Sequence, residues 1–116
     1  MTEIHDEIFA ILRRRREKDK IPGVVLAEKL NITPRKLRDC IEEMRNEGIP
    51  IGSSWRVGDS GYWLITDVHR LAEWIAGRHK WLTKQHKTIE KMKKFYITQG
   101  GQMDMLNELI DQNTEN

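Results

Sequence analysis

Apolar residues recur at helical spacing in the first segment of the chain, from Thr2 to about Arg16. Positions three, four and seven residues apart share one face of a helix. Thr2 can cap the start of this helix, and the acidic residues that follow suit the positive end of its dipole. Arginines at 13–16 end the segment; we favour a solvated face for them, with phosphate contact as the alternative. The predicted buried face consists of Ile4, Ile8, Ile11 and Leu12.

Two further helices are predicted, separated by a tight turn at residues 31–33. The first is short and covers residues 24–30. The second begins where Thr33 precedes Pro34, because a hydroxyl cap followed by proline at the first helical position is a strong start signal. Gly48 supplies its stop, so the helix should end one or two residues before it. Its apolar stripe consists of Leu37, Cys40, Ile41 and Met44, with Cys40 as a small core residue.

After these helices the period of the pattern changes to two, which is typical of strands. Residues 49–57 alternate in polarity, residues 62–65 form a second apolar run, and the glycine-rich residues 58–61 between them predict a turn. The pair is therefore predicted to be a β-hairpin. We expect Trp55 and Trp63 to cover the small core of the protein, with stacking on bases as the alternative.

A long helix is predicted from Thr66 to roughly Ile97, and Gly100-Gly101 ends it. Apolar residues recur along it every seven residues, as in the seam of a coiled coil. At about 1.5 Å per residue, this helix is longer than so small a domain can bury by itself. Self-association into a homodimer or higher homo-oligomer is the favoured role, and non-specific DNA contact by its many cations is the alternative. The seam consists of Val68, Leu71, Ile75, Leu82, Ile89, Met92 and Tyr96.

The last segment, residues 100–116, contains acidic but no basic side chains and a short amphipathic pattern. We expect a short helix here, and a tail that folds back could pair Asp104 and Glu108 with lysines of the long helix. The chain is therefore predicted to consist of a domain at residues 1–65, the long helix at residues 66–99 and the acidic tail at residues 100–116.

Composition narrows the class of protein. The chain has 116 residues, of which 38% are apolar and 33% charged, and its formal net charge is +2. Such a chain suits one small domain with an appended element. No apolar run reaches the roughly 18 residues of a membrane span, the start lacks a leader pattern, and one cysteine excludes an internal disulfide framework. We expect a cytoplasmic protein with no membrane contact.

Candidate catalytic or metal chemistry is sparse. His79 and His86 are seven residues apart, too far for a shared ligand set on one helix, so no metal is expected. The glycine-rich turn at 58–61 lacks the lysine and the following helix of a nucleotide-binding loop. Because no nucleophile or base stands beside a positioned partner, we expect neither catalysis nor a cofactor.

The order of elements is helix, short helix, turn, capped helix and hairpin, which is the layout of a winged helix-turn-helix domain. The predicted fold class is mainly α with a small β-hairpin, extended by a long C-terminal helix. Over residues 4–65 the chain also resembles the DNA-binding module at the front of biotin-protein-ligase repressors, and in size it resembles small stand-alone winged-helix proteins of bacteria and phages. The resemblance rests on Leu26-Ala27-Glu28-Lys29-Leu30-Asn31-Ile32-Thr33, on Ile41-Glu42-Glu43-Met44-Arg45-Asn46-Glu47-Gly48-Ile49-Pro50-Ile51 and on Gly61-Tyr62-Trp63-Leu64.

The resemblance implies that the capped helix enters the major groove of DNA with its N-terminal end, where arginine suits bidentate contacts with base edges. The hairpin arm is expected to touch phosphate or the minor groove. Its tip departs from the family pattern, because it has one acid and no cation. The implied contact residues are Thr33, Arg35, Lys36, Arg38 and Arg45 on the helix and Ser54 and Arg56 on the hairpin.

These observations predict sequence-specific binding of double-stranded DNA by a small transcriptional regulator of bacterial or phage type. No ligase activity is implied, because only about 50 residues follow the resembling part. The alternative is a non-enzymatic protein-interaction module that uses the winged domain and the long helix for assembly. A near-neutral domain with acids along the rear of its capped helix keeps this alternative open.

Overall fold

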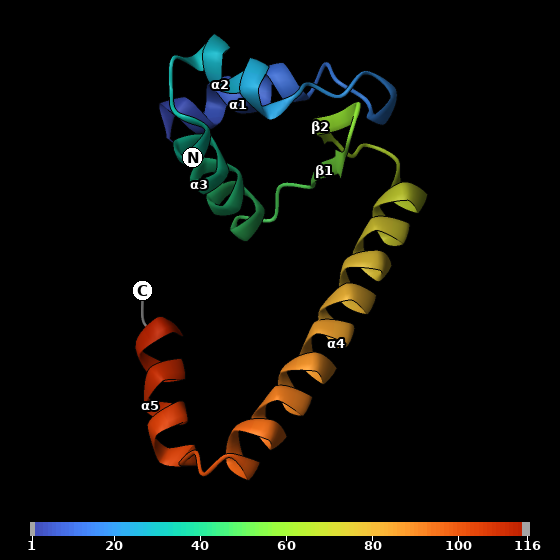
Figure 1. Cartoon of the computed structure of the whole chain (residues 1–116). Helices are drawn as coiled ribbons and strands as arrows, with labels where there is room; N and C mark the ends of the chain where they lie inside the picture. The colour runs from blue at the N-terminus through green and yellow to red at the C-terminus, as the bar shows by residue number, and fades with distance from the viewer. Residues whose placement is uncertain (1, 115–116) are drawn as a thin grey trace. The chain divides into compact units, whose positions relative to one another are not determined.

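The computed structural model describes residues 2–114 and is mainly α with one small β-hairpin, as predicted (Figure 1). The chain divides into two compact units, Met1–Ile75 and Ala76–Asn116, here called the N-terminal and C-terminal units. The elements in order are α1 (Glu3–Leu12), a 3₁₀ turn (Glu17–Asp19), α2 (Gly23–Leu30), α3 (Pro34–Asn46), β1 (Ile51–Arg56), β2 (Asp59–Leu64), α4 (Val68–Thr98) and α5 (Met103–Thr114).

One hydrophobic core holds the N-terminal unit together. The buried faces of α1, α2 and α3 meet there with the inner face of the hairpin. Cys40 is buried in this core, which confirms its predicted place. The largest fully buried side chains are Ile8, Leu12, Ile21, Leu26, Leu37, Ile41, Met44, Ile51 and Cys40.

Helix α1 begins where predicted and ends earlier. The Thr2 hydroxyl accepts a hydrogen bond from the backbone N–H of His5 at 3.3 Å, which caps the helix. The helix ends at Leu12, its last buried residue, so the predicted extension to Arg16 is wrong. Short helices owe their stability mainly to the packing of an apolar face, and the arginines beyond Leu12 offer no such face.

Helix α3 has the start and stop that its sequence predicts. The Thr33 hydroxyl accepts a hydrogen bond from the backbone N–H of Lys36 at 3.1 Å, and Pro34 occupies the first turn. Past the end of the helix, Gly48 has a φ of +91°, a left-handed conformation that glycine adopts without steric cost. The helix therefore projects its N-terminal end from a fixed position on the core.

The hairpin turns at Val57-Gly58, so the predicted tip at residues 58–61 is wrong. Asp59 to Gly61 instead belong to β2, which pairs antiparallel with β1. The reason is a third, isolated bridge: Ile21 and Tyr62 exchange two backbone hydrogen bonds of 2.9 and 2.8 Å. A Cβ atom on Gly61 would lie 2.6 Å from the carbonyl oxygen of Ile21, so this close approach requires glycine.

The first turns of α4 belong to the N-terminal unit. Asp67, and not the predicted Thr66, caps the helix, since its carboxylate accepts a hydrogen bond from the backbone N–H of His69 at 2.8 Å. Three residues after Asp67, Arg70 forms an ion pair with Glu17 at 2.6 Å. The division between the two units consequently falls inside α4, after Ile75.

In the C-terminal unit a turn that is fixed by hydrogen bonds joins α4 to α5. The Tyr96 hydroxyl donates to the carbonyl oxygen of Gln102 and accepts from its N–H, both at 3.1 Å. Gly100 has a φ of +90°, and a Cβ on Gly101 would overlap the Tyr96 ring. The two glycines therefore end α4, as predicted. Neither Asp104 nor Glu108 forms an ion pair with a lysine within residues 2–114.

No helix in the described part of the chain combines the length and apolar character needed to cross a membrane.

Candidate nucleic-acid interface

The N-terminal end of α3 presents three cations to solvent. Arg35, Lys36 and Arg38 are all exposed, and none of them forms an ion pair with any residue from 2 to 114. They follow the capped first turn, where the helix dipole is positive. Leu37 between them is buried and anchors the turn in the core. This end of α3 therefore carries a compact positive charge that is available to an anion.

Two acids near the C-terminal end of α3, Glu43 and its C-cap Glu47, lie near α1 and are used inside the unit. His5 is 2% exposed, and its Nε2 lies 2.9 Å from a carboxylate oxygen of Glu43. The backbone N–H of Thr2 donates to Nδ1 of the same ring at 3.5 Å, so Nε2 carries the proton and donates to Glu43. A carboxylate oxygen of Glu47 lies 4.0 Å from Nδ1 of the same ring. Sequence reasoning missed this role of His5, although the histidine stands three residues before the buried Ile8.

An apolar groove separates the start of α3 from the hairpin. Its walls include Val24, Pro34 and Leu37 on the helix side and Tyr62 on the hairpin side, and Arg38 stands at its edge. The groove is therefore continuous with the cationic end of α3.

Trp55 stands beside this groove on β1. It is 72% exposed, so the prediction that it covers the core is wrong, whereas Trp63 is 6% exposed and confirms its prediction. The Trp55 ring meets Tyr62 edge to face, with centroids 6.3 Å apart. The hairpin extends past the helices, so the outer part of β1 has no core to cover. The sequence signal that could have identified Trp55 as exposed is its position near the end of the predicted first strand, next to the turn.

The two predicted hairpin residues are two apart in β1, so they share one face of the strand, and both line a pocket with Asp59 and Trp63. Ser54 also borders the groove, together with Trp55. Arg56 pairs in register with Asp59, and successive strand residues point to opposite faces, so Arg56 faces away from the groove. Asp59 is neutralised by Lys20, whose Nζ lies 2.7 Å from its carboxylate. The acid at the hairpin tip is therefore not a free negative charge.

Arg45 has a structural position. Its Nε and Nη2 donate to the carbonyl oxygen of Ile51 at 3.0 and 2.8 Å, and Nη2 also donates to the hydroxyl of Ser53 at 3.0 Å. The guanidinium lies over the Trp74 ring, 5.3 Å from its centroid. In the structure the Arg45 guanidinium therefore fixes the hairpin to the end of α3.

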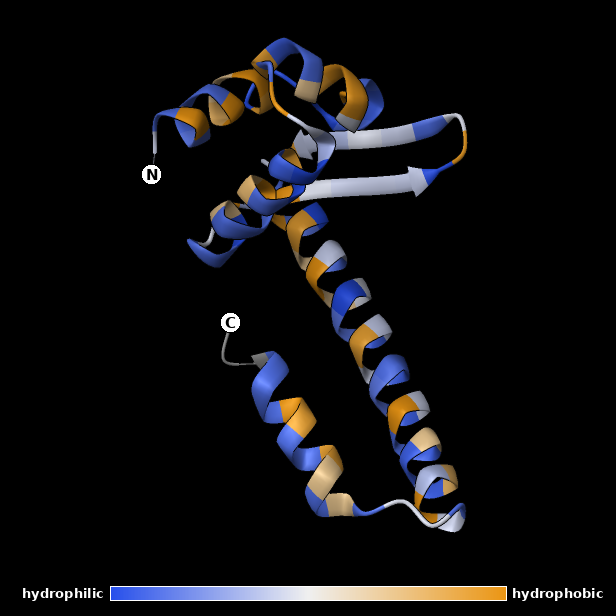
Figure 2. Cartoon of the chain, turned by 60° about the vertical axis from the view of Figure 1, so that its left-hand side comes forward, coloured by the Kyte–Doolittle hydropathy of each residue, from blue (hydrophilic) through white to orange (hydrophobic). Residues whose placement is uncertain are grey.

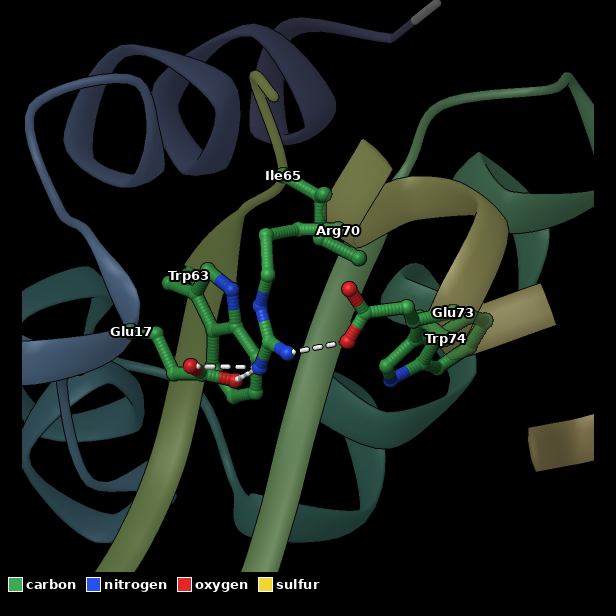
Figure 3. A pocket seen from close by; sticks show the side chains of 6 residues that line it. All are labelled: Glu17, Trp63, Ile65, Arg70, Glu73 and Trp74. Carbon is green, nitrogen blue, oxygen red and sulfur yellow. Dashed lines mark hydrogen bonds and ion pairs between the residues drawn. The ribbon is translucent and has the colours of Figure 1, made fainter. Parts of the chain in front are cut away.

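On the far side of the hairpin, Arg70 lies between two carboxylates, as Figure 3 shows. It binds both oxygens of Glu17 at 2.6 and 2.7 Å and one oxygen of Glu73 at 2.6 Å. The hydrogen bonds that Arg70 donates to Glu17, and then the negative charge of Glu17, hold the pKa of Arg70 above its ordinary value. Trp63 and Trp74 line the same pocket. A fixed cation between two acids is an anchor for α4 rather than a reactive group.

Within the described residues no group of three or more histidine, cysteine, aspartate or glutamate side chains could hold a metal ion. Searches of protein-family models, curated proteins and solved structures find no match for this chain. The resemblance to winged-helix repressors therefore stays a prediction, and the geometry of the N-terminal unit carries the functional argument.

Proposed function

We propose that this protein binds double-stranded DNA in a sequence-specific manner, as a small transcriptional regulator of bacterial or phage type. In this proposal the N-terminal unit is a winged helix-turn-helix domain, α3 is its recognition helix and the hairpin is its wing. The supporting observation is the cationic first turn of α3. Its leading cations are exposed and form no ion pair within residues 2–114, whereas Glu43 and Glu47 lie near His5.

The leading end of α3 enters the major groove. Arg35, Lys36 and Arg38 reach base edges and phosphates, and Arg is suited to the two acceptors of guanine. Thr33 shapes the start of the helix through its cap and stands at the same edge. Ser54 contacts the sugar-phosphate backbone from the groove beside α3.

Two predicted contacts take revised roles in this proposal. Arg56, on the outer face of the hairpin, reaches the neighbouring phosphates only from the tip. Arg45 keeps the hairpin in place and makes no DNA contact of its own.

A second copy of the chain covers the apolar seam of α4. Val68, Ile75, Leu82 and Ile89 are exposed and seven residues apart, with Met92 beside them, while Leu71 and Tyr96 are half-buried. Identical seven-residue repeats complement one another across two parallel or antiparallel helices. A homodimer would place two recognition helices on two half-sites. The single cysteine, buried in the core, suits the reducing cytoplasm in which such a regulator acts.

Selection from a random duplex pool, followed by fluorescence anisotropy on the selected sequence, tests the proposal. We expect the double variant Arg35→Ala/Arg38→Ala to keep its fold and to lose preference for the selected sequence. The matched control Arg13→Ala/Arg14→Ala removes the same charge from exposed residues after α1 and should retain that preference. Equal sequence preference in wild type and Arg35→Ala/Arg38→Ala would refute the assignment of α3.

A protein-docking function is the second candidate, and exposed apolar residues favour it. Val24, Trp55 and Val57 are all exposed, and the first two border the groove next to α3. Exposed apolar surface of this kind is typical of protein contacts. The two functions differ in their response to salt, because duplex binding weakens steeply as salt rises. Absence of duplex binding even at low salt would favour protein docking.

A further inference from the structure

Helix α4 carries a row of lysines on one face in the C-terminal unit. Between residues 76 and 98 its basic residues far outnumber its acids, of which Glu90 is the sole example. Steps of four, three, four and three residues keep side chains on one side of an α-helix. The residues at those steps, here called the lysine face, are exposed throughout. They are Lys80, Lys84, Lys87, Lys91 and Lys94.

Among residues 2–114, no acid pairs with the lysine face. Glu90 is engaged elsewhere, with Lys93 at 3.2 Å and His86 at 4.0 Å. None of the lysine-face residues forms an ion pair with a residue in the range 2–114. Like charges three or four residues apart destabilise a helix, and a helix face that merely meets water commonly alternates the two signs. An unbroken row of one sign is therefore suited to a polyanion.

The lysine face lies on the opposite side of α4 from the apolar seam. Residues seven apart repeat on one side of the helix, which puts Leu82 and Ile89 on one side and Lys84, Lys87 and Lys91 on the other. Figure 2 shows the resulting mixture of hydrophobic and hydrophilic residues along the helix. Pairing of two copies through the seam therefore leaves the lysines accessible.

The position of the lysine face opposite the apolar seam also indicates which kind of polyanion it suits. A helix that lies on a membrane buries its apolar face and reaches lipid headgroups with cations at the edges of that face. The lysine face points away from the apolar seam, so it would point away from the headgroups. Double-stranded DNA needs no apolar insertion and offers a regular line of phosphates. From Lys80 to Lys94 the helix advances about 21 Å, the length of about six base pairs.

We propose that the lysine face of α4 is a second DNA-binding surface, which contacts phosphates without reading sequence. This inference rests on the proposed function, because it takes duplex DNA as the ligand of the chain. In this proposal the lysine face of α4 contributes affinity for DNA, and α3 contributes the preference for a particular sequence. The two roles predicted for the long helix, self-association and DNA contact, are then compatible, since they use opposite faces.

The test compares the salt dependence of binding to a random-sequence duplex between 50 and 200 mM KCl. The variant Lys84→Gln/Lys87→Gln/Lys91→Gln removes three charges from the lysine face, and glutamine keeps a high helix propensity. Each lost phosphate contact lowers the slope of log Kobs against log salt by about 0.9, so the slope should fall by about 2.7. Over this fourfold change in salt, wild type should lose about 40-fold more affinity than the variant.

Matched controls separate this surface from net charge and from α3. Arg13→Gln/Arg14→Gln/Lys18→Gln removes three exposed charges elsewhere and should keep the wild-type slope. Circular dichroism and sedimentation should show unchanged helix content and oligomeric state for both triple variants. The variant Arg35→Ala/Arg38→Ala should still bind random duplex through the lysine face with steep salt dependence.

The outcomes distinguish the inference from the proposed function. A wild-type slope in Lys84→Gln/Lys87→Gln/Lys91→Gln, with wild type binding DNA, overturns the lysine face and leaves the proposed function standing. Failure of wild type to bind any duplex at low salt overturns both. Sedimentation with vesicles of phosphatidylserine and phosphatidylcholine in the absence of duplex binding would assign the lysines to a membrane.

Discussion

Replacement of Arg45 by alanine should destabilise the N-terminal unit without directly removing a DNA contact. The guanidinium donates twice to the Ile51 carbonyl, at 3.0 and 2.8 Å, and once to the Ser53 hydroxyl, at 3.0 Å. It also stacks on Trp74. Hydrogen bonds from a charged donor contribute about 1.5–3 kcal/mol, and a cation–π contact about 0.5–1 kcal/mol. The free energy of unfolding should therefore fall by about 2–4 kcal/mol.

Urea denaturation, followed by circular dichroism at 222 nm and by tryptophan fluorescence, measures this change. With a slope of about 1–3 kcal/mol per molar urea, typical of small proteins, the midpoint should fall by about 1 M or more. Arg45→Met retains much of the aliphatic stem but none of the donors, so it isolates the hydrogen bonds and the stacking. The matched control is Arg38→Ala, which removes from the same helix an exposed arginine that has no ion pair within residues 2–114, and it should change stability by less than about 0.5 kcal/mol.

The DNA measurement distinguishes this structural role from the DNA contact that the sequence predicts. Under conditions in which Arg45→Ala is fully folded, its salt slope on a random duplex should equal that of wild type, because no phosphate contact has been lost. An unchanged midpoint in urea together with a slope lowered by about 0.9 would refute our reasoning and return Arg45 to the DNA interface.

Three further changes probe the hairpin and the core. Gly61→Ala should lower the urea midpoint strongly, because its Cβ would lie 2.6 Å from the Ile21 carbonyl oxygen. In the control Gly58→Ala the new Cβ meets nothing within 4 Å, so this variant should cost only about 1 kcal/mol of backbone strain. Equal losses of stability in the two variants would contradict the close approach of Ile21. Trp55→Ala should leave the thermal midpoint nearly unchanged and weaken DNA binding severalfold at an unchanged salt slope, and a changed slope would argue against an apolar contact. Burial raises the pKa of the Cys40 thiol above its ordinary value of 9.0. The thiol therefore stabilises the fold fully below pH 9, and this contribution to the free energy of unfolding declines as the pH rises further. In Cys40→Ala the urea midpoint should accordingly fall less between pH 8 and 10.5 than it does in wild type.

The helices that carry local start and stop signals could be predicted from the sequence. Thr33 and Pro34 begin α3 and Gly48 ends it, because a cap, a fixed φ and a left-handed glycine act within a few residues. The end of α1 could not be predicted in this way. Arginine has a good helix propensity, so the run after Leu12 favours helix locally, but its side chains offer no apolar face to the core.

The hairpin shows where long-range contacts override local signals. Glycine at Gly61 is typical of a turn, yet here it admits the backbone of Ile21, forty residues earlier in the chain. Trp55 and Trp63 look alike in the sequence, but only Trp63 lies where a core exists to cover. A prediction from local pattern includes neither the backbone bridge between Ile21 and Tyr62 nor the extent to which the hairpin projects beyond the core.

The candidate DNA surface follows from the positions of its acids as much as from its cations. The sequence shows a nearly balanced N-terminal half, which argues against a DNA surface when only net charge is considered. In the structure Glu43 accepts a hydrogen bond from the ring of His5, and Asp59 pairs with Lys20. These acids therefore fasten α1 to α3 and the hairpin to the core, and they do not oppose an approaching phosphate from the front. The proposed DNA binding needs a cationic face rather than a cationic protein, and the exposed cations at the start of α3 supply such a face at a net charge near zero.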